Sequence, residues 1–195
     1  LRNSFYTFLF LSLALPSFGQ DIYTPPKLQN TIPVIDGQIQ AGEWESAEEV
    51  LLDFEVDPGN NVSPKEKTIA YISYTDTHLY VAVHAFADPK EIRASVRSRD
   101  DFGMIGDDFI LLRFDTYTDG RNNYLLLVNP FGSQLDARAI NALTDDERYD
   151  SSFNLEYETQ GTIVSDGYQV EFKIPFSSIP FPNGTDQLWH FNITR

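Results

Sequence analysis

The feature that most limits the fold of this chain is a series of short apolar segments that turns separate at close intervals. Segment 168–174 alternates strictly, with apolar side chains at Tyr168, Val170, Phe172 and Ile174. A period of two predicts a strand with one face in a core and the other in water. Residues 78–86 are largely apolar at both alternating sets of positions, which predicts an interior strand.

Turn-forming residues stand between these segments. Thr75-Asp76-Thr77 separates segment 68–74 from segment 78–86, and Asp166-Gly167 precedes the strand that begins at Tyr168. A polar loop over residues 116–123 lies between the segments Phe109 to Phe114 and Tyr124 to Val128. Short connections of this kind join antiparallel neighbours, so we expect hairpins at these places.

Helical signals are few. Ala41 to Val50 is expected to form a short helix and Pro175 to Ile179 a single turn, and no helical segment lies between the paired strands. The high content of aromatic residues, 14%, also favours strands. These patterns predict an all-β fold, an antiparallel β-sandwich of jelly-roll-like form with one or two short helices.

The first residues differ from the rest of the chain. An apolar run from Phe5 to Ala14 is followed by Pro16 and by Ser17-Phe18-Gly19, as in a secretory signal peptide that is cleaved before Gln20. We therefore expect a signal peptide at 1–19, a linker at 20–31 and one sandwich domain at 32–195. The expected location is the periplasm, the outer membrane or the cell surface. A strand pattern runs to the last residue, so we expect the domain to be truncated there.

The charge and the missing residue types exclude several functions. A formal net charge of −15 repels phosphates and argues against nucleic-acid binding. The absence of cysteine excludes disulfides, zinc-thiolate sites and cysteine nucleophiles. No metalloprotease, G-x-S-x-G or phosphate-loop motif is present, so we expect this domain not to be an enzyme. A longer glycoside-hydrolase-associated protein that contains this domain stays open.

Several short motifs follow one another in an order that points to a known family. Val34-Ile35-Asp36-Gly37 is followed by Trp44, and later come Leu79-Tyr80-Val81, Asp107 to Asp115, Gly167-Tyr168-Gln169-Val170-Glu171 and Trp189-His190-Phe191-Asn192-Ile193. Together they resemble family 9 carbohydrate-binding modules over residues 32–195. This resemblance implies a sandwich that binds a glycan or oligosaccharide.

Further motifs narrow the resemblance. Arg99-Asp100, Asn129-Pro130-Phe131-Gly132 and Ile174-Pro175-Phe176 resemble the N-terminal domain of large Bacteroidetes-type envelope proteins. That resemblance implies a downstream domain of the same chain, expected to be an outer-membrane barrel, as a partner. The role implied is carbohydrate catabolism or the handling of envelope glycans.

The ligand site departs from the family pattern. Where the family carries the first of two sugar-stacking tryptophans, this chain has Gly103-Met104-Ile105-Gly106, and the second would lie beyond Arg195. Trp44 and Trp189 are expected in the core. Loop aromatics and polar neighbours then remain as candidates, because a ring face suits sugar C–H groups and a guanidinium suits hydroxyls. The predicted ligand-binding residues are Arg99, Asp100, Phe102, Tyr117 and Asn129.

Acidic residues gather near the predicted strand ends and suggest a structural calcium ion. Calcium takes six to eight oxygen ligands, which loops supply without strict spacing. The resemblance to the family raises the same expectation. The predicted metal ligands are Asp107, Asp108, Asp115, Asp119 and Asp136. Solvated surface carboxylates are the alternative interpretation.

Two functions therefore stay open. The first is glycan binding in an exported protein. The second is a structural or protein-interaction domain of an outer-membrane protein that keeps the fold without a sugar site, which the missing tryptophan favours.

Overall fold

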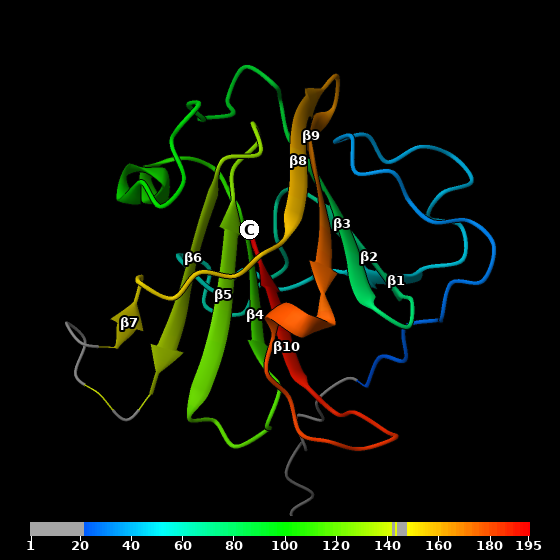
Figure 1. Cartoon of the computed structure of the whole chain (residues 1–195). Helices are drawn as coiled ribbons and strands as arrows, with labels where there is room; N and C mark the ends of the chain where they lie inside the picture. Colours follow the sequence, from blue (N-terminus) through cyan, green and yellow to red (C-terminus); the bar gives the residue numbers. More distant parts are fainter. Residues whose placement is uncertain (1–21, 142, 144–147) are drawn as a thin grey trace, which may run out of the picture.

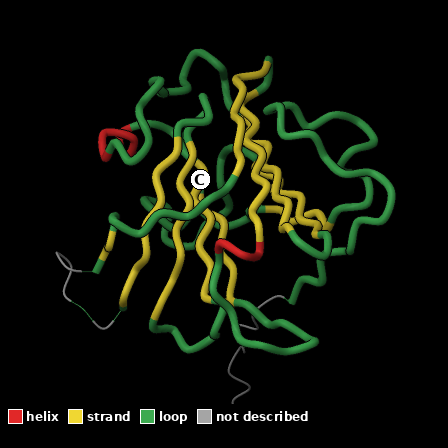
Figure 2. Tube along the Cα trace, viewed as in Figure 1, coloured by secondary structure: helices red, strands yellow, loops and turns green. Residues whose placement is uncertain are grey.

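The computed structural model describes residues 22–141, 143 and 148–195, and these residues form two antiparallel sheets that face each other (Figures 1 and 2). The prediction of an antiparallel β-sandwich is confirmed. In the first sheet the strand order is β1-β2-β3-β9-β8, and in the second it is β10-β4-β5-β6-β7. Neighbouring strands pair antiparallel throughout both sheets.

The elements of the first sheet are β1 (Glu48–Leu51), β2 (Thr68–Tyr74), β3 (His78–Phe86), β8 (Glu158–Val164) and β9 (Gly167–Pro175). Those of the second are β4 (Ile110–Asp115), β5 (Asn122–Val128), β6 (Gln134–Ile140), β7 (Tyr149–Asp150) and β10 (His190–Thr194). Two 3₁₀-helices accompany them, η1 (Phe102–Gly106) and η2 (Phe176–Ser178). Within the described ranges no helix has the length and apolar character needed to cross a membrane.

The predicted hairpins are present. The turn at 75–77 joins β2 to β3, the turn at 165–166 joins β8 to β9, and the loop at 116–121 joins β4 to β5. The core lies between the sheets. It is made of the inward faces of both, including Val81 and Val83 of β3, Leu112 and Phe114 of β4, and Val170 and Phe172 of β9.

The expected helix at Ala41 to Val50 is wrong. Residues 41–46 form turns, and Glu48–Leu51 is the edge strand β1, paired with β2. The side chains of this strand alternate between partly buried and exposed, so its pairing with β2 outweighs the local helical preference. The expected turn after Pro175 is confirmed as η2.

The N-terminal segment covers the outer face of the first sheet. Leu28 and Trp44 are buried there against Tyr80 and Ala82, and Ile35 packs on the same cluster. The backbone of Leu28 also donates a hydrogen bond to Tyr74 at 2.7 Å, so part of the predicted linker 20–31 belongs to the packed domain. The predicted signal peptide at 1–19 lies outside the described residues.

This cover changes the interpretation of β9. The sequence predicted a solvent-facing side for this strand, but Glu171 on that side is fully buried. Its carboxylate accepts hydrogen bonds from the backbone N–H groups of Asp36 at 3.0 Å and Gly37 at 2.8 Å, and from the indole of Trp44 at 3.1 Å. Gly37 has φ +82°, and a Cβ there would lie 2.6 Å from Oγ1 of Thr162, so this position requires glycine.

Candidate functional site

The loop of residues 93–108, between β3 and β4, carries half of the predicted site residues and folds over one end of the second sheet (Figure 1). Its backbone is tied to the start of β6, because Asp100 donates to the carbonyl of Gln134 at 2.9 Å and Arg97 donates to Oγ of Ser133 at 3.0 Å. Two such bonds to a sheet position the loop relative to rigid strands. Asp100 itself has φ 62°, a left-handed conformation that Asp tolerates better than most residues.

Asp107 is the most heavily bonded acid of this loop. Its carboxylate accepts from Nε and Nη2 of Arg97, both at 2.9 Å, and from Nδ2 of Asn129 at 2.9 Å. The hydrogen bonds from Arg97 above all hold the pKa of Asp107 down at about 2. Asp107 therefore stays ionised and paired throughout the physiological pH range, and it braces the loop against the end of β5.

The side-chain amide of Asn129 makes all of its hydrogen bonds within the protein. Its amide donates to Asp107 and to the carbonyl of Ser95 at 2.7 Å, and its carbonyl oxygen accepts from the N–H groups of Phe131 and Ser133 at 3.0 Å each. The residue is fully buried. In this conformation its bonds shape the β5–β6 turn, and none of them points to a ligand.

Arg99 and Asp136 form a second internal network. Nη2 of Arg99 donates to the fully buried carboxylate of Asp136 at 2.5 Å and to the carbonyl of Leu155 at 2.6 Å, while the N–H of Leu155 donates to Asp136 at 2.6 Å. Burial raises the pKa of Asp136, and the hydrogen bonds oppose that shift. The pair fastens the connection between β7 and β8 to β6.

Exposed rings remain at the same end of the second sheet. Phe102 on η1 is 55% exposed, and Phe131 in the β5–β6 turn is 45% exposed. Val96 and Ile105, on the loop of residues 93–108, are exposed as well. Of the predicted ligand residues at this end, Phe102 is the one whose side chain is free to contact a ligand, because the polar ones are engaged internally.

Tyr117 lies elsewhere. It belongs to the loop between β4 and β5, and the whole of β4 separates it from Phe102. A strand of this length spans about 20 Å, so the two rings lie at opposite ends of the sheet and do not form one site. Tyr117 is 47% exposed at its own end.

The predicted calcium ligands lie at three separate places. Asp107 and Asp108 precede β4, Asp115 and Asp119 follow it, and Asp136 is inside the sandwich. In the part of the chain that the structure describes, no group of three or more acidic or histidine side chains is arranged to hold a metal ion. The predicted acids therefore do not fit a single calcium ion, and calcium binding stays a prediction.

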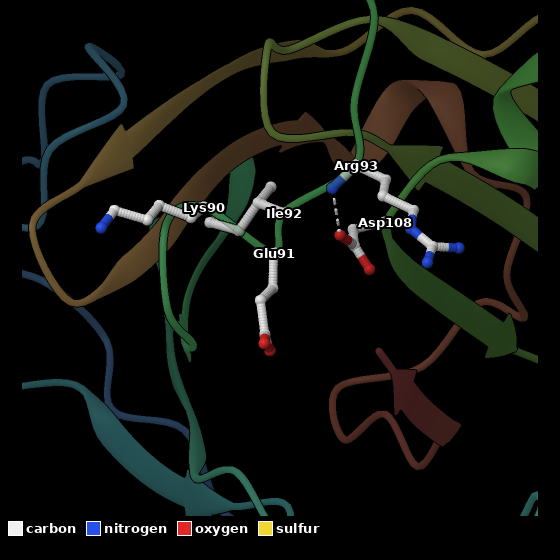
Figure 3. Close-up of a pocket in the computed structure, with 5 residues that line it drawn as sticks. All are labelled: Lys90, Glu91, Ile92, Arg93 and Asp108. Atoms are coloured by element: carbon white, nitrogen blue, oxygen red, sulfur yellow. Dashed lines mark hydrogen bonds between the residues drawn. The ribbon is translucent and has the colours of Figure 1, made fainter.

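An open hollow of about 570 Å³ lies beside the start of β4 (Figure 3). Its lining residues are Lys90, Glu91, Ile92, Arg93 and Asp108. The carboxylate of Asp108 accepts from the backbone N–H of Arg93 at 2.7 Å, and the side chains of Lys90 and Arg93 extend in opposite directions. The lining contains no aromatic ring, so the hollow offers no stacking surface for a sugar.

Two residues of this region were not predicted. Arg97, which pairs with Asp107, carried no signal, because nothing in the sequence singles it out among the arginines of the loop. Phe131 did carry one, since a ring between proline and glycine in a predicted turn is expected at the surface. Neither residue was assigned a role from the sequence.

Comparison with known proteins adds information on the fold. No protein-family model and no curated protein sequence matches the chain. Solved structures do match. A family 9 carbohydrate-binding module from Caldicellulosiruptor kristjanssonii in complex with glucose has 18% identity and a TM-score of 0.50, with 84% of this chain and 74% of that chain covered.

The same family 9 module in complex with cellotriose gives 18% identity and a TM-score of 0.50, with 85% of this chain and 72% of that chain covered. A putative carbohydrate-binding protein from Bacteroides uniformis gives 13% identity and a TM-score of 0.54, with 75% and 70% covered. At this level of identity the likeness concerns the fold. The chain is therefore a domain with a fold like that of family 9 carbohydrate-binding modules.

Proposed function

We propose that this domain binds a glycan on the exposed surface formed by Phe102 of η1 and Phe131 of the β5–β6 turn. The observation that carries the proposal is the exposure of these rings on segments that hydrogen bonds hold rigidly together. An aromatic face contacts the C–H groups of a sugar ring, and a fixed ring loses little freedom on binding. The glucose and cellotriose complexes of the similar module support a saccharide as the ligand class.

The proposed activity is binding without catalysis. Glycoside hydrolysis uses a carboxylic acid that is protonated near neutral pH beside a second carboxylate. Asp107, whose side chain is 6% exposed, has its pKa lowered to about 2 and is paired with Arg97, so it is unsuited to donate a proton. The other buried acid near the loop, Asp136, is enclosed by Arg99 and Leu155.

The proposed setting is an exported protein in which the domain serves attached domains. The predicted signal peptide at 1–19 supports export to the periplasm, outer membrane or cell surface. A downstream region, an outer-membrane barrel in the resembling envelope proteins, would then present the domain to glycans. Isolation of the protein from cell fractions, with N-terminal sequencing, tests both cleavage before Gln20 and location.

A second candidate function is a structural or protein-interaction domain. One observation favours it: Arg99, Asp100 and Asn129, the polar residues expected to read sugar hydroxyls, are engaged in contacts within the protein. A surface with few free hydrogen-bond donors also suits an apolar protein partner.

A glycan array followed by calorimetry separates these functions. We expect the purified chain to bind at least one β-linked glucan, and Phe102→Ala to weaken that binding about tenfold or more, a typical loss for an anchoring ring. Tyr117→Ala is the matched control, because it removes a ring of similar exposure at the other end of the sheet. If the chain binds none of the glycans even at millimolar concentration, glycan binding is refuted and the structural or protein-interaction function takes its place.

A further inference from the structure

The helix that carries Phe102 is short and has two different sides. On one side, Met104 is fully buried against Leu127 and Leu135 of the second sheet. On the other side, Phe102 and Ile105 are exposed. Isolated 3₁₀ turns of this length have poor hydrogen-bond geometry and do not hold a conformation by themselves. Contacts outside the helix must therefore fix the orientation of the exposed ring.

Acidic residues cap both ends of this helix. Asp101 is the N-cap, and its Oδ1 accepts from the N–H of Gly103 at 2.8 Å. Asp107 is the C-cap, and its backbone N–H donates to the carbonyl of Met104 at 3.0 Å. The two carboxylates thus stand at the entry and the exit of the turn that displays Phe102.

Arg97 contacts both of these carboxylates. Its guanidinium makes a two-pronged pair with Asp107, from Nε and Nη2 at 2.9 Å each, and its Nη1 lies 3.5 Å from Oδ2 of Asp101. The Asp107 side chain is only 6% exposed and that of Arg97 23%, so water screens the pair weakly. Bidentate guanidinium–carboxylate pairs fix orientation as well as distance.

The guanidinium also lies directly against the helix backbone. A Cβ placed on Gly103 would lie 2.4 Å from Nη1 of Arg97, so a side chain at this position would force the guanidinium to shift. The glycine next to Phe102 therefore leaves room for Arg97 to approach Asp101 in the observed position. This contact places the cation beneath the turn, between its two caps.

We propose that Arg97 is the positioning residue of the glycan surface, because it joins the caps of η1 and holds Phe102 in one orientation before a ligand arrives. The inference rests on the proposed function and assigns no ligand contact to Arg97 itself. Pre-ordering of a contact residue improves affinity by removing the entropy loss of ordering it on binding. Lysine cannot replace arginine here, since it has a single ammonium group and cannot hold both carboxylates in a planar fork.

Amide hydrogen exchange and calorimetry test this inference together. The exchange rates of Gly103, Met104 and Asp107 report on η1 directly, because each of these N–H groups bonds within the capped turn. Cellotriose is the calorimetric probe. We expect Arg97→Lys to speed exchange at these amides and to weaken cellotriose binding about tenfold, the order of effect for a residue that must be ordered on binding.

The control and a milder variant keep the result interpretable. Arg138→Lys disturbs a more exposed guanidinium–carboxylate pair, with Asp150 at 3.0 Å on β6 and β7, and should change neither readout. Asp101→Asn keeps an efficient N-cap but removes one carboxylate from Arg97, so it should give a smaller change of the same kind. It also replaces Arg97→Lys as the test if that variant does not fold.

The outcomes separate the two proposals. Unchanged exchange at Gly103, Met104 and Asp107 in Arg97→Lys refutes the positioning role, and so does unchanged cellotriose affinity when exchange is faster. Failure of the parent chain to bind cellotriose or any other glycan overturns the proposed function instead.

Discussion

Glu171 and Trp44 are 127 residues apart in the sequence, and the indole Nε1 of Trp44 donates a hydrogen bond to the carboxylate of Glu171 at 3.1 Å. The other oxygen of Glu171 accepts from the N–H groups of Asp36 and Gly37. A single buried carboxylate thus fastens the N-terminal segment to the outer face of the first sheet. Burial raises the pKa of this group to about 6, and the hydrogen bonds only partly offset that effect.

The raised pKa of Glu171 predicts that stability falls as pH rises through the mildly acidic range. The unfolded chain has the ordinary pKa of 4.5, so between that value and about 6 the native state binds more protons than the unfolded state. The contribution of Glu171 is therefore most favourable below the unfolded pKa and is lost by pH 6 to 7, a change of about 2 kcal/mol. Urea unfolding at a series of pH values measures it.

Glu171→Gln isolates this effect, because it removes the titrating group and leaves all others in place. We expect the difference between the two unfolding free energies to change between pH 4 and 7 and to be constant above that range. Parallel curves for the parent and Glu171→Gln across the whole range would show that Glu171 titrates normally.

Trp44→Phe should destabilise the domain more than Trp189→Phe. The first change removes a hydrogen bond to a buried carboxylate, worth about 1.5–3 kcal/mol. Among the described residues the indole nitrogen of Trp189 has no hydrogen-bond partner, so its replacement loses packing alone. Chemical denaturation at pH 7 compares the two variants. Equal losses of unfolding free energy would mean that the hydrogen bond from Trp44 contributes nothing measurable.

The strands and hairpins could be predicted because their signals are local. Alternation from Tyr168 to Ile174 and the turn at Asp166-Gly167 lie within a dozen residues of each other, and both appear as expected in β8 and β9. Strand β6, which lies between β5 and β7, was not predicted although Gln134–Ile140 also alternates. Its polar set, which includes Asp136, faces the sandwich interior and is satisfied by Arg99 and Leu155 from other segments.

The site could be predicted only in part, because burial of polar groups depends on distant segments. Nothing near Glu171 in the sequence indicates that residues 36–44 cover it. The roles expected of Arg99 and Asn129 also changed once their partners Asp136 and Asp107 were known. The separation of Phe102 from Tyr117, in contrast, already follows from the predicted strand between them.

Arg99→Met should be among the most destabilising changes in the domain. It leaves the fully buried carboxylate of Asp136 without its cation, which typically costs about 3–5 kcal/mol. The double variant Arg99→Met/Asp136→Leu should recover part of that loss, because no unpaired charge remains. A double-mutant cycle by urea unfolding gives the coupling energy.

Arg138→Met is the reference for that cycle. Its pair with Asp150 is about one-third exposed on each side, so its loss should cost about 0–1 kcal/mol. Similar costs for Arg99→Met and Arg138→Met would mean that Asp136 finds water or another donor when Arg99 is absent.

Calcium removal gives the last prediction, and Asp115 is the acid through which it should act. Asp107 and Asp136 are already neutralised by arginines, whereas the buried Oδ1 of Asp115 has no hydrogen-bond partner in the described ranges. A bound ion stabilises the native state by about 2.7 kcal/mol at a hundredfold excess over its dissociation constant. The calcium prediction requires that a chelator lower the melting temperature by about 5–10 °C, and that calcium restore it. Asp115→Asn should abolish the response and Asp108→Asn, at the other end of β4, should preserve it. A melting curve that a chelator leaves unchanged, together with no calcium by elemental analysis, would exclude a structural calcium ion from this domain.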